Sequence, residues 1–351
     1  GPDAKIVDIG IEAREFACKW KPDIIGNSIM TGDTAKFKEL NDELKSRIKF
    51  TAMVGGPDPT FFPEGYEWAD TIIAGEAEQV IADLLQSGKK YPSIDSLPHP
   101  DRTDFPDMRI RDFIASRGCA WDCGYCYNAS WNKLFPEISK VRTRNAKDVV
   151  EEIRSTNPSF VYFQDSTFGI STKWLRDFSW QYKLYVNAPY HVHMRPNQVT
   201  EERVLLLHDS NCVSMKIALE TASNRLRKLI NRGNTNNSDA HVAARLLKKW
   251  DIKLILQNIV GLPSATIEED LETLEVNIRC NPAYSWVSIF QPYPKTELAK
   301  YCEQEKLYTG DYSEIQDNFF DGSVLNISEE HKMQVACLQR VFAFCVEMKV
   351  M

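Results

Sequence analysis

Short apolar stretches alternate with amphipathic helical patterns along most of the chain, and this alternation limits the possible folds most strongly. Apolar strands joined by helices predict a parallel sheet with helices on both faces. The first 86 residues therefore predict a doubly wound, Rossmann-like α/β domain. The strands are expected at 4–9, 23–30 and 49–56 and the helices at 12–20 and 34–47, and the alternation of strand and helix continues through 69–86.

Residues 87–108 contain several prolines and show little periodicity, so they are expected to form a linker. The alternation then resumes, and one helix opens with a capping box of Thr266 and Glu269. Six strand–helix units predict a partial (β/α)6 barrel over 109–310, with the chemistry on loops after the strands. A helical segment is expected over 311–351. The six strands are expected at 110–116, 159–165, 185–190, 213–220, 253–260 and 286–291.

Composition narrows the class of protein. The chain has 351 residues, with 43% hydrophobic and 26% charged side chains, which is typical of a folded globular protein. No apolar run is long enough for a membrane span and no signal peptide opens the chain, so a cytoplasmic location is expected. A net charge of -7 disfavours nucleic acid as a partner. Small molecules, lipids or peptides are the expected substrates.

Three of the nine cysteines, Cys119, Cys123 and Cys126, lie within eight positions of one another, and the others are scattered. An odd, scattered set does not form a secreted disulfide framework. Structural zinc takes four ligands, whereas three cysteines on a four-iron cluster leave one iron open to another ligand. The loop follows the first expected barrel strand, which is a suitable place for such a site. Unrelated buried cysteines or a partial zinc knuckle are the alternatives.

With Tyr125 just before the last cysteine, the C-x-x-x-C-x-x-C loop resembles that of the radical S-adenosylmethionine superfamily. The resemblance implies that Cys119, Cys123 and Cys126 hold a [4Fe–4S] cluster. The open iron would chelate S-adenosylmethionine, and reductive cleavage would give a 5′-deoxyadenosyl radical. An external one-electron reductant of the flavodoxin or ferredoxin type is implied as a partner.

Later segments resemble the same superfamily, and the resemblance implies further cofactor contacts. Glu220 matches a strand-end carboxylate near the cofactor, and Arg232 a basic residue near the cofactor carboxylate. Where many members have Gly-Gly-Glu, this chain has Gln164, Asp165 and Ser166. The segment from Asn258 through Gly261 to Pro263 is expected near the adenosine, and Gln291 is a further expected cofactor contact.

The first domain resembles cobalamin-binding (B12-binding) domains through "NSIMTG", "VGGPDP" and "AGEAE". Paired glycines at a strand end allow close approach to a ligand, although a tight turn alone also explains them. Together with the second resemblance, this makes the chain similar to cobalamin-dependent radical S-adenosylmethionine enzymes. The implied cobalamin contacts are Ser28, Met30, Thr31, Gly55, Gly56, Pro57, Gly75 and Glu76.

Two departures from that family are visible. The family domain usually starts with a further strand and helix, and some relatives carry there a histidine ligand of cobalt, whereas the first histidine here is His99. We therefore expect either a missing N-terminal piece or a cobalt without a histidine ligand. The apolar helical pattern at the end of the chain suggests that a C-terminal extension is missing too.

The resemblance implies a methyltransferase. One S-adenosylmethionine would methylate reduced cobalamin, a second would yield the radical that removes hydrogen from an unactivated substrate carbon, and methylcobalamin would supply the methyl group. Ring contraction, cyclisation or hydroxylation are alternatives, as are a cobalamin carrier and an iron–sulfur electron-transfer protein. His191, His193, Arg195 and Tyr293 are the catalytic candidates, although alternating histidines also suit one face of a strand. Trp121 and Tyr127 are expected to face the cavity.

Overall fold

The computed structural model describes residues 5, 11–102, 109–138, 140–315 and 318–351. The chain divides into two compact units, which are treated separately below. One comprises residues 1–106 with 312–318, and the other comprises residues 107–311 with 319–351. The strand expected at 4–9 lies almost entirely outside the described residues.

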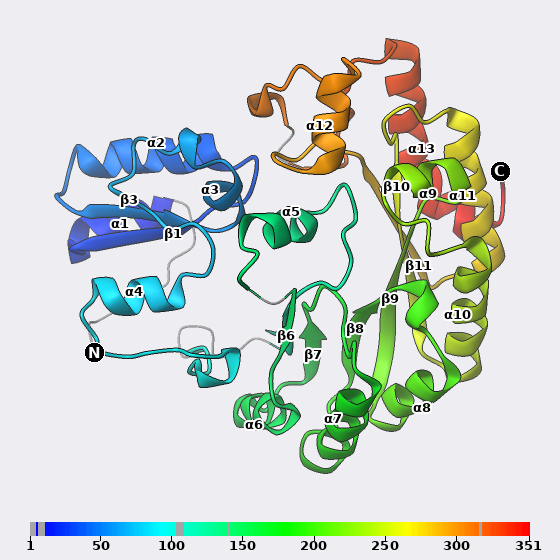
Figure 1. Ribbon diagram of the computed structural model, residues 1–351, viewed down its shortest axis with the longest axis horizontal. Helices are drawn as coiled ribbons and strands as arrows, with labels where there is room; N and C mark the ends of the chain where they lie inside the picture. Colours follow the sequence, from blue (N-terminus) through cyan, green and yellow to red (C-terminus); the bar gives the residue numbers. More distant parts are fainter. Residues whose placement is uncertain (1–4, 6–10, 103–108, 139, 316–317) are drawn as a thin grey trace. The chain divides into compact units, whose positions relative to one another are not determined.

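The first unit is built on a parallel three-stranded sheet of order β1-β2-β3. Figure 1 shows α2 and α4 on opposite sides of these strands. Ala17 of α1 packs with Leu40 and Leu44 of α2 in one small core. The elements are α1 (Ile11–Trp20), β1 (Ile24–Ser28), α2 (Thr34–Lys45), β2 (Thr51–Gly55), α3 (Pro57–Phe61), β3 (Thr71–Ile72) and α4 (Glu78–Leu84), with short 3-10 helices at Pro63–Gly65, Ile94–Ser96 and Tyr312–Glu314.

The second unit contains six parallel strands in the order β11-β10-β9-β8-β7-β4, so neighbours in the sheet follow one another in the chain. Figure 1 shows this curled sheet with α6, α7, α8, α10 and α11 along its outer side. The strands are β4 (Ile110–Phe113), β7 (Phe160–Phe163), β8 (Tyr190–Met194), β9 (Cys212–Glu220), β10 (Lys253–Val260) and β11 (Tyr284–Ile289), and a small antiparallel pair joins β5 (Ser116–Gly118) to β6 (Val141–Thr143).

Crossover helices join successive strands and cover one face of the sheet, as a partial (β/α)6 barrel requires. A helical C-terminal region follows, so the predicted fold class is confirmed. The helices are α5 (Tyr127–Leu134), α6 (Ala146–Thr156), α7 (Thr172–Tyr185), α8 (Glu201–Asp209), α9 (Asn224–Leu229), α10 (Asn237–Lys249), α11 (Ile267–Cys280), α12 (Glu297–Gln304) and α13 (Glu329–Met348), with a 3-10 helix at Pro196–Gln198.

Most of the expected strands are found within a few residues, but the strand expected at 185–190 is wrong. Helix α7 continues to Tyr185, and β8 starts only at Tyr190. The reason is that Trp174, Phe178 and Tyr182 recur at helical spacing and pack against the sheet. The predicted capping box at Thr266 is confirmed, because both of its hydrogen bonds to and from Glu269 are present.

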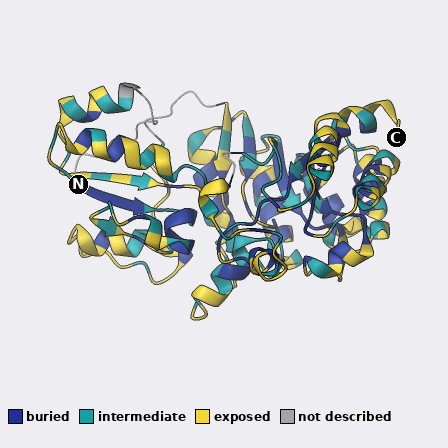
Figure 2. Ribbon diagram, turned by 90° about the horizontal axis from the view of Figure 1, so that it is seen from above, coloured by how far each residue is buried: buried dark blue, intermediate teal, exposed yellow. Residues whose placement is uncertain are grey.

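Every second residue of each strand points toward the outer helices, and these residues form the main core with them. Val161 and Phe163 of β7 and Met215 and Ile217 of β9 are fully buried there. Figure 2 shows buried residues concentrated in the strands and on the helix sides that face them. The residues between them point to the other face, where most, such as Tyr162 and Lys216, are partly buried, whereas His191 is 1% exposed. One face of the sheet therefore stabilises the fold, and the other face remains available for ligands.

Truncating a core side chain of α7 tests this division. We expect Leu175→Ala to lower the free energy of unfolding by about 2–5 kcal/mol, because Leu175 is fully buried and its loss leaves a cavity. Leu184→Ala on the same helix is the control, since Leu184 is 57% exposed. Urea denaturation of both variants measures the difference. Equal losses in both variants would contradict the assignment of the buried face.

Candidate active site at the carboxyl ends of the strands

The cysteine loop begins where β5 ends and finishes at the start of α5. Gly118, directly before Cys119, has φ +85°. A Cβ at this position would collide with the carbonyl oxygen of Lys140, which precedes the partner strand β6. The β5–β6 pair therefore fixes how the loop starts, and only glycine fits before the first cysteine.

Segments far away in sequence hold the middle of this loop. The Gly124 amide donates to the Ile230 carbonyl at 3.0 Å, and the Leu298 amide donates to the Gly124 carbonyl at 2.8 Å. The Asn231 side chain donates to the Asp122 carbonyl at 2.6 Å. These bonds join the loop to the segment after α9 and to α12, so the cysteines have fixed positions in the folded chain.

The three loop cysteines are free thiols, with Cys123 buried and the other two partly buried. Burial raises the pKa of Cys119, and it raises the pKa of Cys126 to about 11. Cys119 and Cys126 therefore remain neutral thiols near neutral pH unless bound iron compensates the thiolate charge. In the described part of the chain, no group of three or more His, Cys, Asp or Glu side chains is already gathered around one point where a metal ion could bind.

A buried ion pair lies beside the loop. The Nη1 of Arg232 is 3.7 Å from the Oε1 of Glu220, and both side chains are at most 3% exposed. Tyr125 donates its hydroxyl to the same carboxylate oxygen at 2.5 Å. Burial raises the pKa of Glu220, although Arg232 acts against this shift. The Nη1 of Arg232 also lies 3.8 Å from the Cys123 sulfur, so this cluster connects the cysteine loop to the end of β9.

Glu220 has an unusual backbone conformation, with φ +67°. The pairing between β9 and β10 changes register at the same point, where Asn258 lies opposite Glu220. A non-glycine residue in this region costs on the order of 1–3 kcal/mol and is found preferentially at functional sites. The surrounding hydrogen bonds hold the carboxylate in this position.

A second buried guanidinium lies at the end of β8. Arg195 is 4% exposed, lies over the Trp121 ring at 4.7 Å and donates one hydrogen bond to Asn234 at 2.9 Å. Its Nε and Nη1 atoms have no hydrogen-bond partner. With Glu220 as the one carboxylate of this cluster, Arg195 and Arg232 leave an excess of positive charge. Three thiolates around an iron–sulfur cluster would balance this excess, so the residues present fit such a group.

Other buried polar atoms at these strand ends also lack partners, which indicates a polar ligand. They are Glu220 Oε2, Arg232 Nε and Gln291 Oε1, whereas the Gln291 amide group donates to the Gly322 carbonyl at 2.9 Å. Glu220 ends β9, Arg232 follows α9 and Gln291 follows β11, and the carboxyl ends of parallel strands meet at one edge of the sheet. This set fits a zwitterionic ligand such as S-adenosylmethionine.

Four of the residues expected to contact a cofactor have hydrogen bonds or packing contacts within the protein. Asp165 is buried, and its two oxygens accept from the Ala115 amide and the Ser116 hydroxyl. Gln164 donates to Asp112 at 2.8 Å. The side-chain amide of Asn258 bonds mainly to Asn277 and to backbone carbonyls. Gly261 has φ +65°, and a Cβ there would lie 2.8 Å from Val335 of α13, so packing alone requires this glycine.

The remaining catalytic candidates lie in two places. The Nδ1 of His191 forms a 2.7 Å hydrogen bond with the Ser214 hydroxyl. The Nε2 of His193 forms a 3.1 Å hydrogen bond with the Tyr162 hydroxyl. Both histidines lie on the face of β8 that the outer helices do not cover. Tyr293, by contrast, packs on Tyr127 beside the cysteine loop, with ring centroids 5.3 Å apart.

In the first unit, the expected cobalamin contacts gather at the carboxyl edge of the sheet. Ser28 ends β1, Gly55 ends β2, Pro57 opens α3, and Gly75 and Glu76 follow β3. Met30, after β1, is 57% exposed, and Thr31 next to it is partly buried. The Ser28 hydroxyl and the glycine backbone allow a large ligand to approach this edge closely, so the residues present fit cobalamin.

The local backbone packing requires a glycine at position 56 whether or not a ligand binds there. Gly56 has φ +100°, and a Cβ there would lie 2.8 Å from the backbone nitrogen and oxygen of Ile29. The Ile29 amide donates to the Gly55 carbonyl at 2.8 Å, so the chain itself makes the close approach that the glycine pair permits. The expected ligand contact at Gly56 therefore has a competing explanation.

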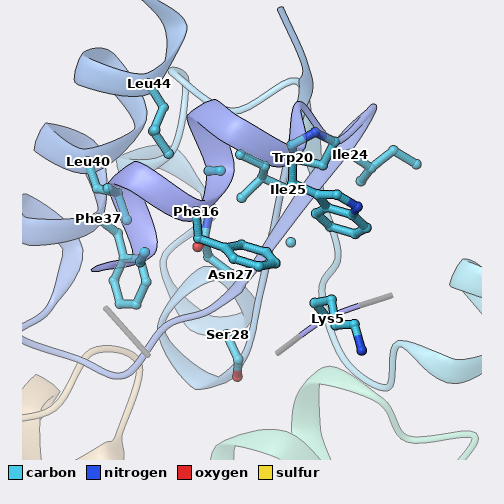
Figure 3. Close-up of a pocket in the computed structure, with 14 residues that line it drawn as sticks. Lys5, Phe16, Trp20, Ile24, Ile25, Asn27, Ser28, Phe37, Leu40 and Leu44 are labelled. Atoms are coloured by element: carbon cyan, nitrogen blue, oxygen red, sulfur yellow. The ribbon is translucent and has the colours of Figure 1, made fainter. Parts of the chain in front are cut away.

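A cavity of about 410 Å³ lies in the first unit between α1, β1 and α2. Figure 3 shows Phe16, Trp20 and Phe37 around it and Ser28 at its rim. All five residues of β1 line it, so it follows the edge of this strand opposite β2. Of the expected cobalamin contacts, Ser28 alone belongs to the lining, and the glycines lie elsewhere.

Sequence reasoning missed Tyr162, Lys216 and Trp286, which share the uncovered face of the sheet with the two histidines. A signal was present in "SMKIALE", where Ser214 and Lys216 alternate with apolar residues. Alternation alone does not reveal which side of a strand the helices cover, so these residues could not be assigned to a site.

Comparison with protein families identifies both units. Residues 3–85 match the B12 binding domain, and residues 113–276 match the Radical SAM superfamily. The chain therefore carries a B12-binding domain followed by a radical SAM domain. The cofactors of these two domain families are cobalamin, S-adenosylmethionine and a [4Fe–4S] cluster, as the sequence analysis expected.

Curated relatives are distant but extend over most of the chain. An uncharacterized methyltransferase, PH0819 of Pyrococcus horikoshii, is 23% identical over 86% of this chain and 75% of its own length. The bacteriochlorophyllide d C-8(2)-methyltransferase of Chlorobaculum tepidum is 23% identical over 82% and 70%. The anaerobic magnesium-protoporphyrin IX monomethyl ester cyclase of Rubrivivax gelatinosus is 24% identical over 82% and 60%.

Solved structures share the fold. The radical S-adenosylmethionine methyltransferase TsrM from Kitasatospora setae superimposes with a TM-score of 0.67 at 14% identity, covering 83% of this chain and 67% of that one. The cobalamin-dependent enzyme OxsB gives a TM-score of 0.62 at 16% identity, covering 97% and 55%. Within the described ranges, no helix is both long enough and apolar enough to span a bilayer.

The buried carboxylate of Asp270 predicts a pH effect on stability. Burial raises the pKa of Asp270 to about 7, while the Gly261 amide donates to it at 3.0 Å. Between the ordinary carboxyl pKa and about 7, the folded chain holds a proton that the unfolded chain releases. The free energy of unfolding therefore falls as the pH rises through this window.

We expect the wild type to lose roughly 2 kcal/mol more stability than Asp270→Asn between about pH 4.5 and pH 7.5. Urea denaturation at the two pH values measures this difference. Asp251→Asn, at an exposed carboxylate, is the control and should follow the wild type. Parallel pH profiles for the wild type and Asp270→Asn would show that Asp270 does not titrate in this window.

Proposed function

We propose that the chain is a cobalamin-dependent radical S-adenosylmethionine methyltransferase that methylates an unactivated carbon of a small molecule, lipid or peptide. One observation carries the proposal: three free cysteines on one fixed loop lie beside the buried Glu220–Arg232 pair, in a chain that also has a B12-binding domain. The methyltransferase names of two curated relatives support it.

In this proposal each part of the chain has one task. Residues 1–86 hold cobalamin at the carboxyl edge of their sheet, and 87–108 connect the two domains. Residues 109–310 hold the cluster and S-adenosylmethionine, and 311–351 complete the substrate side. Cys119, Cys123 and Cys126 bind iron. When bound, the cluster and S-adenosylmethionine supply a carbon radical and cobalamin carries the methyl group, with electrons from a flavodoxin or ferredoxin type of reductant.

The side chains around the loop prepare this site before any ligand binds. Arg195 and Arg232 provide positive charge where the thiolates lie, and their positions are fixed by Asn234, by Glu220 and by the Ala218 carbonyl. Tyr125 occupies one oxygen of Glu220 and leaves Oε2 for a ligand donor. Such preorganised groups lose little entropy on binding, which favours a defined orientation of the ligand.

Ring formation is the second candidate activity. The match to a magnesium-protoporphyrin IX monomethyl ester cyclase has an identity of 24%, close to the 23% of the methyltransferases. A cyclase needs the radical and a bound cobalamin, but no methyl group reaches its product. Product analysis therefore separates the two activities.

Anaerobic reconstitution with iron, sulfide and hydroxocobalamin tests the cofactor set first. We expect about four irons and one cobalt per chain. Labelled S-adenosylmethionine then distinguishes the reactions in the presence of a substrate. Equal amounts of S-adenosylhomocysteine and 5′-deoxyadenosine indicate methyl transfer, whereas deoxyadenosine alone indicates ring formation or related chemistry. Iron without cobalt would overturn the cobalamin assignment.

Removing one loop cysteine should abolish radical chemistry. We expect Cys123→Ala to lose 5′-deoxyadenosine formation by at least about a hundredfold, because its sulfur is one of the three expected iron ligands. Cys337→Ala, at an exposed cysteine on α13, is the matched control and should retain wild-type activity. Retention of activity in Cys123→Ala would contradict the role of the loop.

A further inference from the structure

Polar and aromatic side chains form a continuous group on the concave face of the second sheet, the face that the outer helices leave uncovered. Tyr162 of β7 lies opposite His191 of β8, and His193 lies opposite Lys216 of β9. The Lys216 ammonium lies 5.0 Å from the centre of the Trp286 ring of β11. Neither the cysteine loop nor the Glu220–Arg232 cluster uses these groups.

Lys216 carries the positive charge of this group, and its side chain is partly buried. Its ammonium contacts the face of Trp286, and no carboxylate in the described part of the chain forms an ion pair with it. Burial lowers the pKa of Lys216. A partly buried ammonium without a counter-ion is unfavourable unless a ligand supplies the negative charge.

The side chains next to Lys216 do not neutralise its positive charge. Burial, followed by the charge of Lys216, lowers the pKa of His193 to about 4, and the pKa of His191 is lowered to about 3. Both imidazoles are therefore neutral near pH 7 and serve as hydrogen-bonding groups. The Nε2 of His191 is buried without a partner. Asp112 is the carboxylate on this face, but it lies on the edge strand β4 and accepts from Gln164.

We propose that this concave face binds the carboxylate end of the substrate, with Lys216 as its ion-pair partner and Trp286 as the surface for an adjoining flat apolar part. A single cation suits a singly charged carboxylate better than a phosphate dianion. Neutral donors such as Tyr162 and a histidine would complete the hydrogen bonds of the carboxylate. This inference rests on the proposed function, because it names the substrate class of the same barrel.

The distance along β9 sets the shape of that substrate. Lys216 precedes Glu220 by four residues on one strand, which corresponds to about 13 Å of extended backbone. Glu220 marks the level of the cysteine loop, so the carboxylate lies far from the atoms that react there. The substrate class is therefore an elongated, partly planar carboxylic acid whose reacting carbon lies remote from its charge.

The test compares two probes of equal shape and different charge, 2-naphthoate and its neutral analogue 2-naphthamide. Their affinity for the reconstituted enzyme is measured by ligand-observed NMR at probe concentrations up to ~10 mM. The variants are Lys216→Gln, which removes the charge, and Lys216→Arg, which retains it. Lys249→Gln is the matched control, since Lys249 lies on the outer helix α10 and pairs with Glu201.

We expect the wild type and Lys249→Gln to bind naphthoate more tightly than naphthamide. Lys216→Gln should weaken naphthoate binding about tenfold or more and leave naphthamide unchanged, whereas Lys216→Arg should stay within about threefold of the wild type. Equal binding of both probes, absence of naphthoate binding, or an unchanged Lys216→Gln would overturn the inference.

Formation of 5′-deoxyadenosine without substrate is measured on the same samples. If Lys216-dependent binding is present but deoxyadenosine is absent, the proposed function fails and the carboxylate site stands. If deoxyadenosine forms but naphthoate binding does not depend on Lys216, the carboxylate site fails and the proposed function stands.

Discussion

Parallel pairing of six strands determines which residues of the second unit can meet. Each strand runs in the same direction, so every carboxyl end lies at one edge of the sheet, and residues from Cys119 to Gln291 come together there. The buried pair of Glu220 and Arg232 then connects this edge to the cysteine loop. Without Glu220, the Tyr125 hydroxyl of the loop would lose its partner on β9, and the guanidinium groups of Arg195 and Arg232 would be buried without a carboxylate in this cluster.

Sequence patterns predicted the fold class because hydrophobic periodicity depends on local spacing, which the chain shows directly. The cysteine loop could be predicted as a site for a similar reason, since motif spacing is local, and Glu220 was predicted from a family resemblance of its strand. Element boundaries were less certain. The aromatic residues of α7 are compatible with a strand or with a helix. Because they pack against the sheet at helical spacing, the helix extends to Tyr185, where a strand was expected to begin.

Side-chain direction could not be predicted from the sequence. Asp165 and Asn258 stand at strand ends where a ligand contact was expected, yet their polar atoms bond to Ser116 and Asn277 within the protein. Lys216 was overlooked for the opposite reason. Its strand alternates clearly, but the choice between the covered and the uncovered face depends on helices that come from other parts of the chain.

The division of β9 between two faces has an evolutionary consequence. Met215 and Ile217 pack against the outer helices, whereas Ser214 and Lys216, next to them in sequence, face the opposite side. A substitution at Met215 or Ile217 therefore alters the packing that stabilises the scaffold, whereas a substitution at Ser214 or Lys216 alters only the uncovered face. Descendants of such a barrel can acquire new substrates through substitutions at alternate positions while the packing that keeps them folded is inherited unchanged.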